Sequence, residues 1–153
     1  MHEHIEDIEF ERLLAVAYLA LDEHLHDEAQ RLFTSLVALR LSNPHPRIGL
    51  ALVSYNQHDV IDAIDRLESV LDDFPNAVFT RSLLARFMYE TGRDGWQQMA
   101  RDSLTRSPTG VAADLARYLL AETEPVADTP DSRMQNRFAR NTRTITGVQG
   151  HGR

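Results

Sequence analysis

The chain contains no cysteine and no lysine. The absence of cysteine excludes disulfides, thiolate metal sites and thiol nucleophiles together. No apolar run approaches the roughly 18 residues that a membrane-spanning helix needs, and no basic amino terminus precedes a hydrophobic stretch. We therefore expect no membrane insertion and no cleavable secretory signal, and we expect a cytoplasmic protein.

Signatures of catalysis and of cofactor binding are also missing. There is no G-x-S-x-G elbow for a nucleophilic serine, and segment 92–95 is too short for a phosphate-binding loop and lacks its lysine. The pairs His2/His4 and His24/His26 are the only clusters that resemble metal ligands. Residues spaced in this way point about 200° apart on a helix, so only an extended His2/His4 pair would bind a metal, and weakly. We predict that the chain is not an enzyme and holds no cofactor and no metal.

Charge is distributed unevenly along the chain, whose formal net charge is −7. Residues 125–153 carry five arginines against two aspartates, which contributes +3 and leaves −10 on the rest. An acidic body disfavours nucleic acid and anionic membrane as partners, because phosphate contacts need a basic face. Only the arginine-bearing tail is suited to weak, salt-sensitive contacts.

A self-similarity at an offset of 34 residues is the most informative pattern in the chain. It pairs Val16 and Ala17 with Leu50 and Ala51, Ala29 with Ala63, Phe33 with Leu67, and Leu36 with Val70. This offset is the period of the tetratricopeptide repeat, a helix-turn-helix unit. Such a unit cannot bury its apolar face alone, so units stack into a solenoid whose concave surface is typically used for binding.

Apolar periodicity predicts the helices of three units. The first unit has helices over about residues 5–21 and 27–39, and the second over about 46–55 and 59–74, with Asp59 as an N-cap. In the third unit the first helix ends at Gly92, where a left-handed residue is wanted. Its second helix departs from the period, because Gln97 stands where alanine is expected. Its apolar residues are shifted by three positions, and they are Trp96, Met99, Ala100 and Leu104.

A last helix, over about residues 111–122, is expected to cap the open end of the solenoid. Its predicted packing residues are Val111, Leu115, Tyr118 and Leu119. The predicted fold class is all-α, a tetratricopeptide-like α-solenoid of about three helical hairpins plus a C-terminal capping helix. We expect one helical domain over 1–124 and, because periodicity stops at Pro125, a disordered arginine-containing tail over 125–153. Within that tail, Met134–Arg140 is expected to form at most a helical turn on a partner.

The repeat register also predicts which side chains line the concave groove, because the first helix of each unit faces inward. They are Leu14, Tyr18, Leu21, Ile48, Leu52, Tyr55, Phe79, Arg86 and Tyr89. Tyrosine and aliphatic side chains suit an amphipathic helix or an extended peptide. Domains that clamp a chain terminus instead place several Lys and Asn residues there, and here only Asn56 and Arg86 qualify. The alternative is that half of these residues pack internally or against a partner copy.

The segment from Arg81 to Glu122 resembles the Hrp-type type III secretion accessory family. That family has a short tetratricopeptide-like chain, an L-L-A-x-x-x-Y-x-x-G-D/R-x-x-W pattern and a closing apolar helix. The pattern is matched by Leu83, Leu84, Ala85, Tyr89, Gly92 and Trp96. The likeness spans about residues 9–122 and does not cover the tail. Because the matched positions are mostly packing residues, no ligand-binding residue is implied by it.

The resemblance implies a non-catalytic protein-binding component or chaperone of a bacterial type III secretion system. Related chaperones hold a needle, rod or translocator subunit in the groove before export. The alternative is a self-assembling structural component, in which the apolar surface is an interface of a homo-oligomer. A peptidoglycan-active enzyme is disfavoured because no catalytic constellation is present. The resemblance also implies an alternative location, the periplasm, after export by the secretion system.

Overall fold

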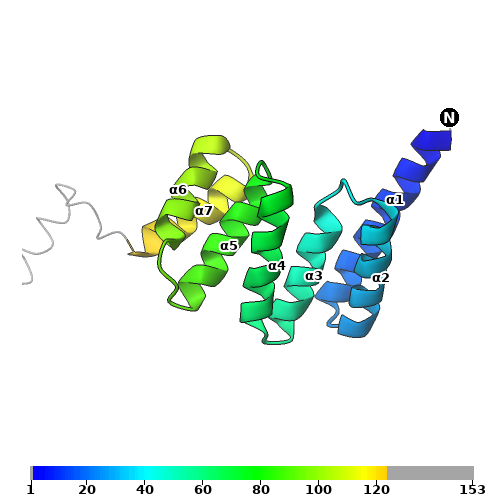
Figure 1. Ribbon diagram of the computed structural model, residues 1–153, viewed down its shortest axis with the longest axis horizontal. Helices are drawn as coiled ribbons and strands as arrows, with labels where there is room; N and C mark the ends of the chain where they lie inside the picture. Colours follow the sequence, from blue (N-terminus) through cyan, green and yellow to red (C-terminus); the bar gives the residue numbers. More distant parts are fainter. Residues whose placement is uncertain (1, 124–153) are drawn as a thin grey trace, which may run out of the picture. The chain divides into compact units, whose positions relative to one another are not determined.

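The computed structural model describes residues 2–123, with side chains from residue 6 to residue 122. Within this part of the chain the structure is all-α and has no strand (Figure 1). The helices are α1 (His2–Asp22), α2 (His26–Leu39), α3 (His45–Asn56), α4 (Val60–Asp73), α5 (Val78–Glu90), α6 (Trp96–Arg106) and α7 (Val111–Thr123). The predicted all-α fold class is confirmed. The predicted disordered tail and its boundary lie outside the described residues.

The chain divides into two compact units, residues 1–120 and residues 121–153, and the helix packing belongs to the first. In that unit α1 to α6 form three helical hairpins, and each helix contacts the next one along the chain (Figure 1). The second helix of each hairpin also packs on the first helix of the following hairpin, as α2 does on α3 and α4 does on α5. This serial packing is the tetratricopeptide-like solenoid that the 34-residue offset predicts.

The turn inside each hairpin has the same backbone conformation. His24, His58 and Gly92 lie 34 residues apart in sequence, and all three have left-handed φ angles, of 60°, 66° and 69°. In each case the next residue donates its N–H to a carbonyl five residues earlier, for example Asp59 to Ser54 at 2.9 Å. This is the Schellman arrangement that ends a helix. The predicted left-handed residue at Gly92 is therefore confirmed.

The start of α4 shows why the chain re-enters a helix so soon after that turn. The carboxylate of Asp59 accepts a hydrogen bond from the backbone N–H of Asp62 at 3.0 Å, as predicted for an N-cap. At the start of α3, Pro46 stands in the first turn, where its missing N–H costs no helical hydrogen bond.

Two apolar clusters form the core of residues 1–120. The first joins α1, α2 and α3, with Phe10, Ala29, Phe33 and Leu36 among its members. The second joins α3, α4, α5, α6 and α7. The alanines predicted at the helix crossings are fully buried, and they are Ala29, Ala51, Ala63, Ala85 and Ala100. The burial of Ala100 confirms the three-residue shift in the third unit.

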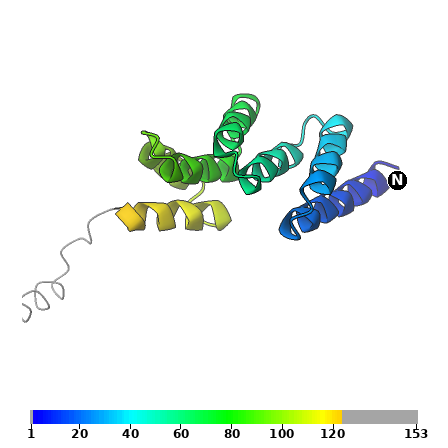
Figure 2. The same ribbon diagram turned by 90° about the horizontal axis from the view of Figure 1, so that it is seen from below.

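The capping helix is present, but its predicted packing face is wrong. Val111 and Tyr118 are 72% and 62% exposed, and α7 instead buries Ala113, Ala116 and Leu119. The reason is a close approach to α5, beside which α7 lies (Figure 2). There the Ser82 hydroxyl donates to the Ala112 carbonyl at 2.8 Å, so the backbone of α7 comes close to α5 at this point. Of the remaining predicted residues, Leu119 is buried and Leu115 is partly buried.

Candidate protein-binding site

The first helices of the three hairpins, α1, α3 and α5, present the surface that we call the A-helix face. Of the nine residues predicted to line a groove there, three belong to the buried core, namely Leu14, Leu21 and Ile48. These three fill the space between helices because the same helix face that points inward also packs against the neighbouring hairpin. The other six keep part of their surface on the outside, and they are Tyr18, Leu52, Tyr55, Phe79, Arg86 and Tyr89.

Tyr18 ties α1 to the rest of the fold. Its ring meets the ring of Phe33 edge-on, with centroids 5.0 Å apart, and its hydroxyl donates to the carbonyl of His45 at 3.0 Å. Burial raises the pKa of Tyr18 to about 12, because the phenolate is poorly solvated there. Tyr18 therefore holds the start of α3 against α1 and leaves little surface for a partner.

Tyr55 is held rigidly between α3 and α5. Its ring stacks on that of Phe87 with centroids 4.3 Å apart, and its hydroxyl donates to Glu90 Oε2 at 2.7 Å. Arg86 closes the group, because its Nε donates to Glu90 Oε1 at 3.0 Å and its guanidinium lies 5.9 Å from the Tyr55 ring centre. The hydrogen bond to Glu90, followed by partial burial, raises the pKa of Tyr55. We call Tyr55, Arg86 and Glu90 the Tyr55 cluster.

Two aromatic side chains on α5, one near each end of the helix, remain substantially open. Tyr89 is 38% exposed although its ring meets that of Trp96 edge-on, at 5.0 Å between centroids. Phe79, at the start of α5, is 36% exposed. An aromatic ring that is fixed at one edge and open at the other can bind an apolar side chain without losing much further freedom. Among the predicted groove residues, Phe79 and Tyr89 are the aromatic side chains with the most exposed surface.

Glu90 is a member of this site that the sequence prediction missed. It lies four residues after Arg86, the spacing at which an acid and a base on one helix pair. It also lies 34 residues after Asn56, which the prediction did consider as an inward position. Both signals were present in the sequence, but neither indicates that Glu90 would also reach across to Tyr55.

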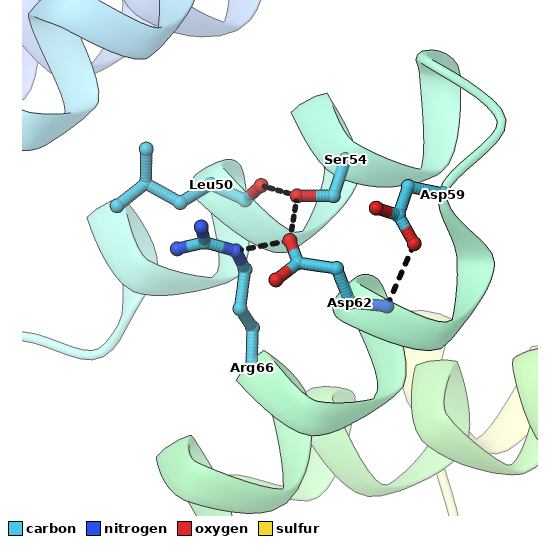
Figure 3. Close-up of polar contacts among 5 residues, drawn as sticks. All are labelled: Leu50, Ser54, Asp59, Asp62 and Arg66. Carbon is cyan, nitrogen blue, oxygen red and sulfur yellow. Dashed lines mark hydrogen bonds and ion pairs between the residues drawn. The ribbon is translucent and has the colours of Figure 1, made fainter.

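A different surface carries a cleft of about 390 Å³, which is lined by residues of α2, α3 and α4. It is lined by Val37, Arg47, Leu50, Asp65, Arg66 and Ser69. At its edge the Ser54 hydroxyl lies 2.5 Å from Asp62 Oδ2, which also accepts from Arg66 Nε at 2.6 Å (Figure 3). The hydrogen bond from Ser54, followed by that from Arg66, holds the pKa of Asp62 below its usual value. This network joins α3 to α4, and its polar groups form hydrogen bonds with one another.

The remaining chemistry-bearing residues form no cluster in the described part of the chain. No group of three His, Asp or Glu side chains within it is placed to hold a metal ion. His2 and His4 lie in α1, not in extended backbone, and His24 is exposed in the first turn. None of the described helices is long and apolar enough to cross a membrane.

The described helices form a tetratricopeptide-like α-solenoid with a partly open aromatic A-helix face. Residues 2–125 match the family described as bacterial type III secretion protein (HrpB1_HrpK), and the chain belongs to this family. The resemblance seen in the segment from Arg81 to Glu122 is confirmed. No curated protein matches the chain in sequence.

A solved protein of low sequence identity, PcrH, shares this fold. PcrH from Pseudomonas aeruginosa is similar with a TM-score of 0.63 and 18% identity, over 74% of this chain and 87% of that one. PcrH in complex with the chaperone binding region of PopB gives the same score and identity over 74% and 93% of the two chains. The type III secretion translocator chaperone SycD of Yersinia enterocolitica has a TM-score of 0.49 and 15% identity, over 89% and 82% of the chains.

Proposed function

We propose that this protein is a non-catalytic chaperone or adaptor of a bacterial type III secretion system, and that its A-helix face binds an apolar segment of another secretion component. Membership of the type III secretion family supports the assignment to a type III secretion system. The observation that carries the proposal is the pair of open aromatic rings, Phe79 and Tyr89, on the inward helix of the third hairpin. PcrH, which has a similar fold, is known in complex with a chaperone binding region.

The Tyr55 cluster supports this use of the face because it prepares the site before a partner arrives. Stacking on Phe87 and the hydrogen bond to Glu90 leave the Tyr55 ring in one orientation. A surface that is rigid in advance loses less conformational entropy when it binds. The charges of Arg86 and Glu90 satisfy each other, so the centre of the site is close to neutral and favours apolar side chains.

The proposed partners are needle, rod or translocator subunits, which would be bound in the cytoplasm before export. An apolar segment of such a subunit needs protection from water until it is secreted, and a solenoid face can hold it as a helix or as an extended chain. A location in the periplasm remains the alternative. The proposal includes no catalytic step, because no acid–base pair in the described residues is set apart from solvent as general acid–base catalysis requires.

The proposal is tested by expressing the chain with each needle, rod and translocator subunit of the same bacterium in turn and measuring the affinity of the pair that copurifies. We expect Tyr89→Ala and Phe79→Ala each to cost about 2 kcal/mol, which is on the order of thirtyfold in Kd. The matched control is Tyr118→Ala, which removes an exposed tyrosine on α7 that is not among the predicted groove residues. Circular dichroism checks that each variant keeps its helical content.

Undiminished binding by both α5 variants would refute the assignment of this face. The alternative function, a self-assembling component, makes a different prediction. In that case light scattering of the purified protein would give an oligomer, and the same substitutions would shift its mass toward the monomer with no secretion subunit present.

A further inference from the structure

A groove lined by α2, α3 and α4 lies on a surface separate from the A-helix face. Its wider part is the cleft of about 390 Å³, and a narrower depression of about 120 Å³ adjoins that cleft. Leu50 of α3 and Arg66 of α4 line both parts, so the two parts lie next to each other. None of the residues predicted to line the A-helix face lines either part. We call the cleft and its adjoining depression the Arg66 groove.

The charge of the wider part differs from that of the body around it. Residues 1–124 carry a formal net charge of −10. Of the six residues that line the cleft, two are cationic, Arg47 and Arg66, and one is anionic, Asp65. Leu50 and Val37 add apolar surface. A cationic and partly apolar lining within an acidic body is complementary to an acidic side chain that stands next to an apolar one.

Arg66 is held so that part of its guanidinium is left for a ligand. Its Nε donates to Asp62 Oδ2 at 2.6 Å, and the same oxygen lies 2.5 Å from the Ser54 hydroxyl. The two Nη atoms lie on the side of the guanidinium that faces away from Asp62 (Figure 3), and they form no hydrogen bond or ion pair within the described residues. The two Nη atoms of a guanidinium match the spacing of carboxylate oxygens. Because Asp62 already fixes the guanidinium, a carboxylate binds there with a smaller loss of side-chain freedom.

Ser69 supplies a further donor to the same cleft. It lies three residues after Arg66, on the same side of α4. Arg47 Nη2 donates to Ser69 Oγ at 2.8 Å, while Arg47 Nη1 donates to Asp73 at 2.6 Å. Because Ser69 accepts from Arg47, its own hydroxyl hydrogen is left to donate, and no residue in the described part of the chain accepts it. Arg66 and Ser69 thus present donors for one carboxylate on one side of the cleft.

The narrower part of the groove indicates what kind of chain carries that carboxylate. It is lined by the exposed side chains of Gln30 and Gln57. Each of these amides can both donate and accept a hydrogen bond, as the peptide groups of an extended chain require. A chain terminus would use only the cleft at Arg66. A groove that continues past Arg66 along amide side chains instead suits a segment that continues beyond its acidic residue.

We propose that the Arg66 groove binds an extended internal segment of a second partner protein, in which an acidic side chain stands next to an aliphatic one. The carboxylate accepts from the Nη atoms of Arg66 and from the Ser69 hydroxyl. The aliphatic side chain lies against Leu50 and Val37. Because this groove is separate from the A-helix face, the chain can hold a secretion subunit on one surface and contact another protein through the other.

The test is an NMR titration of the full isotope-labelled chain with two blocked peptides, acetyl-Leu-Glu-Leu-Gly-amide and acetyl-Leu-Gln-Leu-Gly-amide. The two peptides have nearly the same shape and differ in the charge of one side chain. We expect the glutamyl peptide to shift the Nε–H signal of Arg66 and the backbone amide signal of Ser69. It should bind about fivefold more tightly than the glutaminyl peptide, which is the upper end of the range for an exposed ion pair.

Variants then assign this preference to the proposed donors. Arg66→Gln should abolish the preference for the glutamyl peptide, and Ser69→Ala should reduce it. The matched control is Arg93→Gln, because Arg93 has a similar exposure and pairs with Glu68 but lines neither part of the groove. This control should keep the full preference. Circular dichroism checks that each variant keeps its helical content.

Equal affinities of the two peptides for the parent chain would overturn the proposal. So would a preference that Arg66→Gln leaves intact, or shifts confined to the A-helix face, for example at Tyr89. A third peptide, acetyl-Gly-Leu-Leu with a free terminal carboxylate, separates an internal segment from a chain terminus. Tighter binding of this third peptide than of the glutamyl peptide would show that the groove binds a chain terminus, and the internal segment would be wrong.

Discussion

Gly49 of α3 lies so close to Phe33 of α2 that a Cβ atom on residue 49 would be 2.3 Å from the phenylalanine ring. Phe33 belongs to the first apolar cluster and is fully buried, and the buried Gly49 borders that cluster. The contact sets how closely the first hairpin can approach the second. Because the ring is enclosed on all sides, it cannot move aside to admit a methyl group.

Gly49→Ala should therefore lower the free energy of unfolding by about 1–3 kcal/mol through overpacking, although alanine is the better helix former. Urea unfolding followed by circular dichroism measures it. Adding Phe33→Leu to Gly49→Ala should cost less than the sum of the two single changes, because the smaller leucine relieves the clash with the new methyl group and that methyl group fills part of the cavity that leucine leaves. Strict additivity would show that the two residues do not determine the spacing of the hairpins.

The left-handed histidine in the second hairpin turn should be improved by glycine. His58 adopts a φ of 66° that a side chain disfavours, whereas Gly92 adopts 69° in the equivalent turn of the third hairpin. We expect His58→Gly to raise the free energy of unfolding by about 0.5–1 kcal/mol. Gly92→Ala, where a Cβ meets nothing within 4 Å, should lower it by about 1 kcal/mol through backbone strain alone. Melting temperatures that move in the same direction for both variants would contradict this account.

Ala63→Leu should push α3 away from α4 and cost about 1–3 kcal/mol, because Ala63 is fully buried at the crossing of the two helices. Ala121→Leu is the control, since it makes the same change at an exposed residue near the end of α7. The control should stay within about 0.5 kcal/mol of the parent chain. A neutral Ala63→Leu variant would mean that the repeat register is misplaced.

Stability should fall at alkaline pH because of Tyr18. The folded protein raises the pKa of Tyr18 to about 12, above the value of 10.0 for a free tyrosine, so the folded state keeps its proton longer than the unfolded state does. The contribution of this pKa shift to the free energy of unfolding is fully present below pH 10 and is lost between about pH 10 and pH 12. It amounts to on the order of 2 kcal/mol in total. Urea midpoints at pH 8, 10 and 11 measure the loss.

Tyr18→Phe separates this effect from general alkaline unfolding. At pH 8 the variant should be less stable by about 1 kcal/mol, because the hydrogen bond to the His45 carbonyl is gone. Above pH 10 its stability should fall less steeply than that of the parent chain. If both proteins lose stability at the same rate above pH 10, Tyr18 is not the group responsible.

The sequence by itself determined the local and repeating features of this protein. The 34-residue offset predicted the hairpins and the crossing alanines. Glycine at a helix end located the left-handed turn at Gly92, and apolar periodicity located the displaced Ala100. These features depend on residues within one helix or one turn, where period and conformational preference are sufficient. The side of each helix that carries apolar residues could be predicted from the sequence for the same reason.

Only the tertiary structure decided which of those sides is covered, and by what. It buried Leu14 and Ile48, joined the Tyr18 hydroxyl to His45, and turned α7 so that Ala113 and Ala116 face α5 while Tyr118 remains open. Such outcomes depend on the angle and distance at which two helices meet, which side-chain volumes at many positions set together. Periodicity along one helix carries no information about that approach, so the predicted groove contained both core residues and true surface residues.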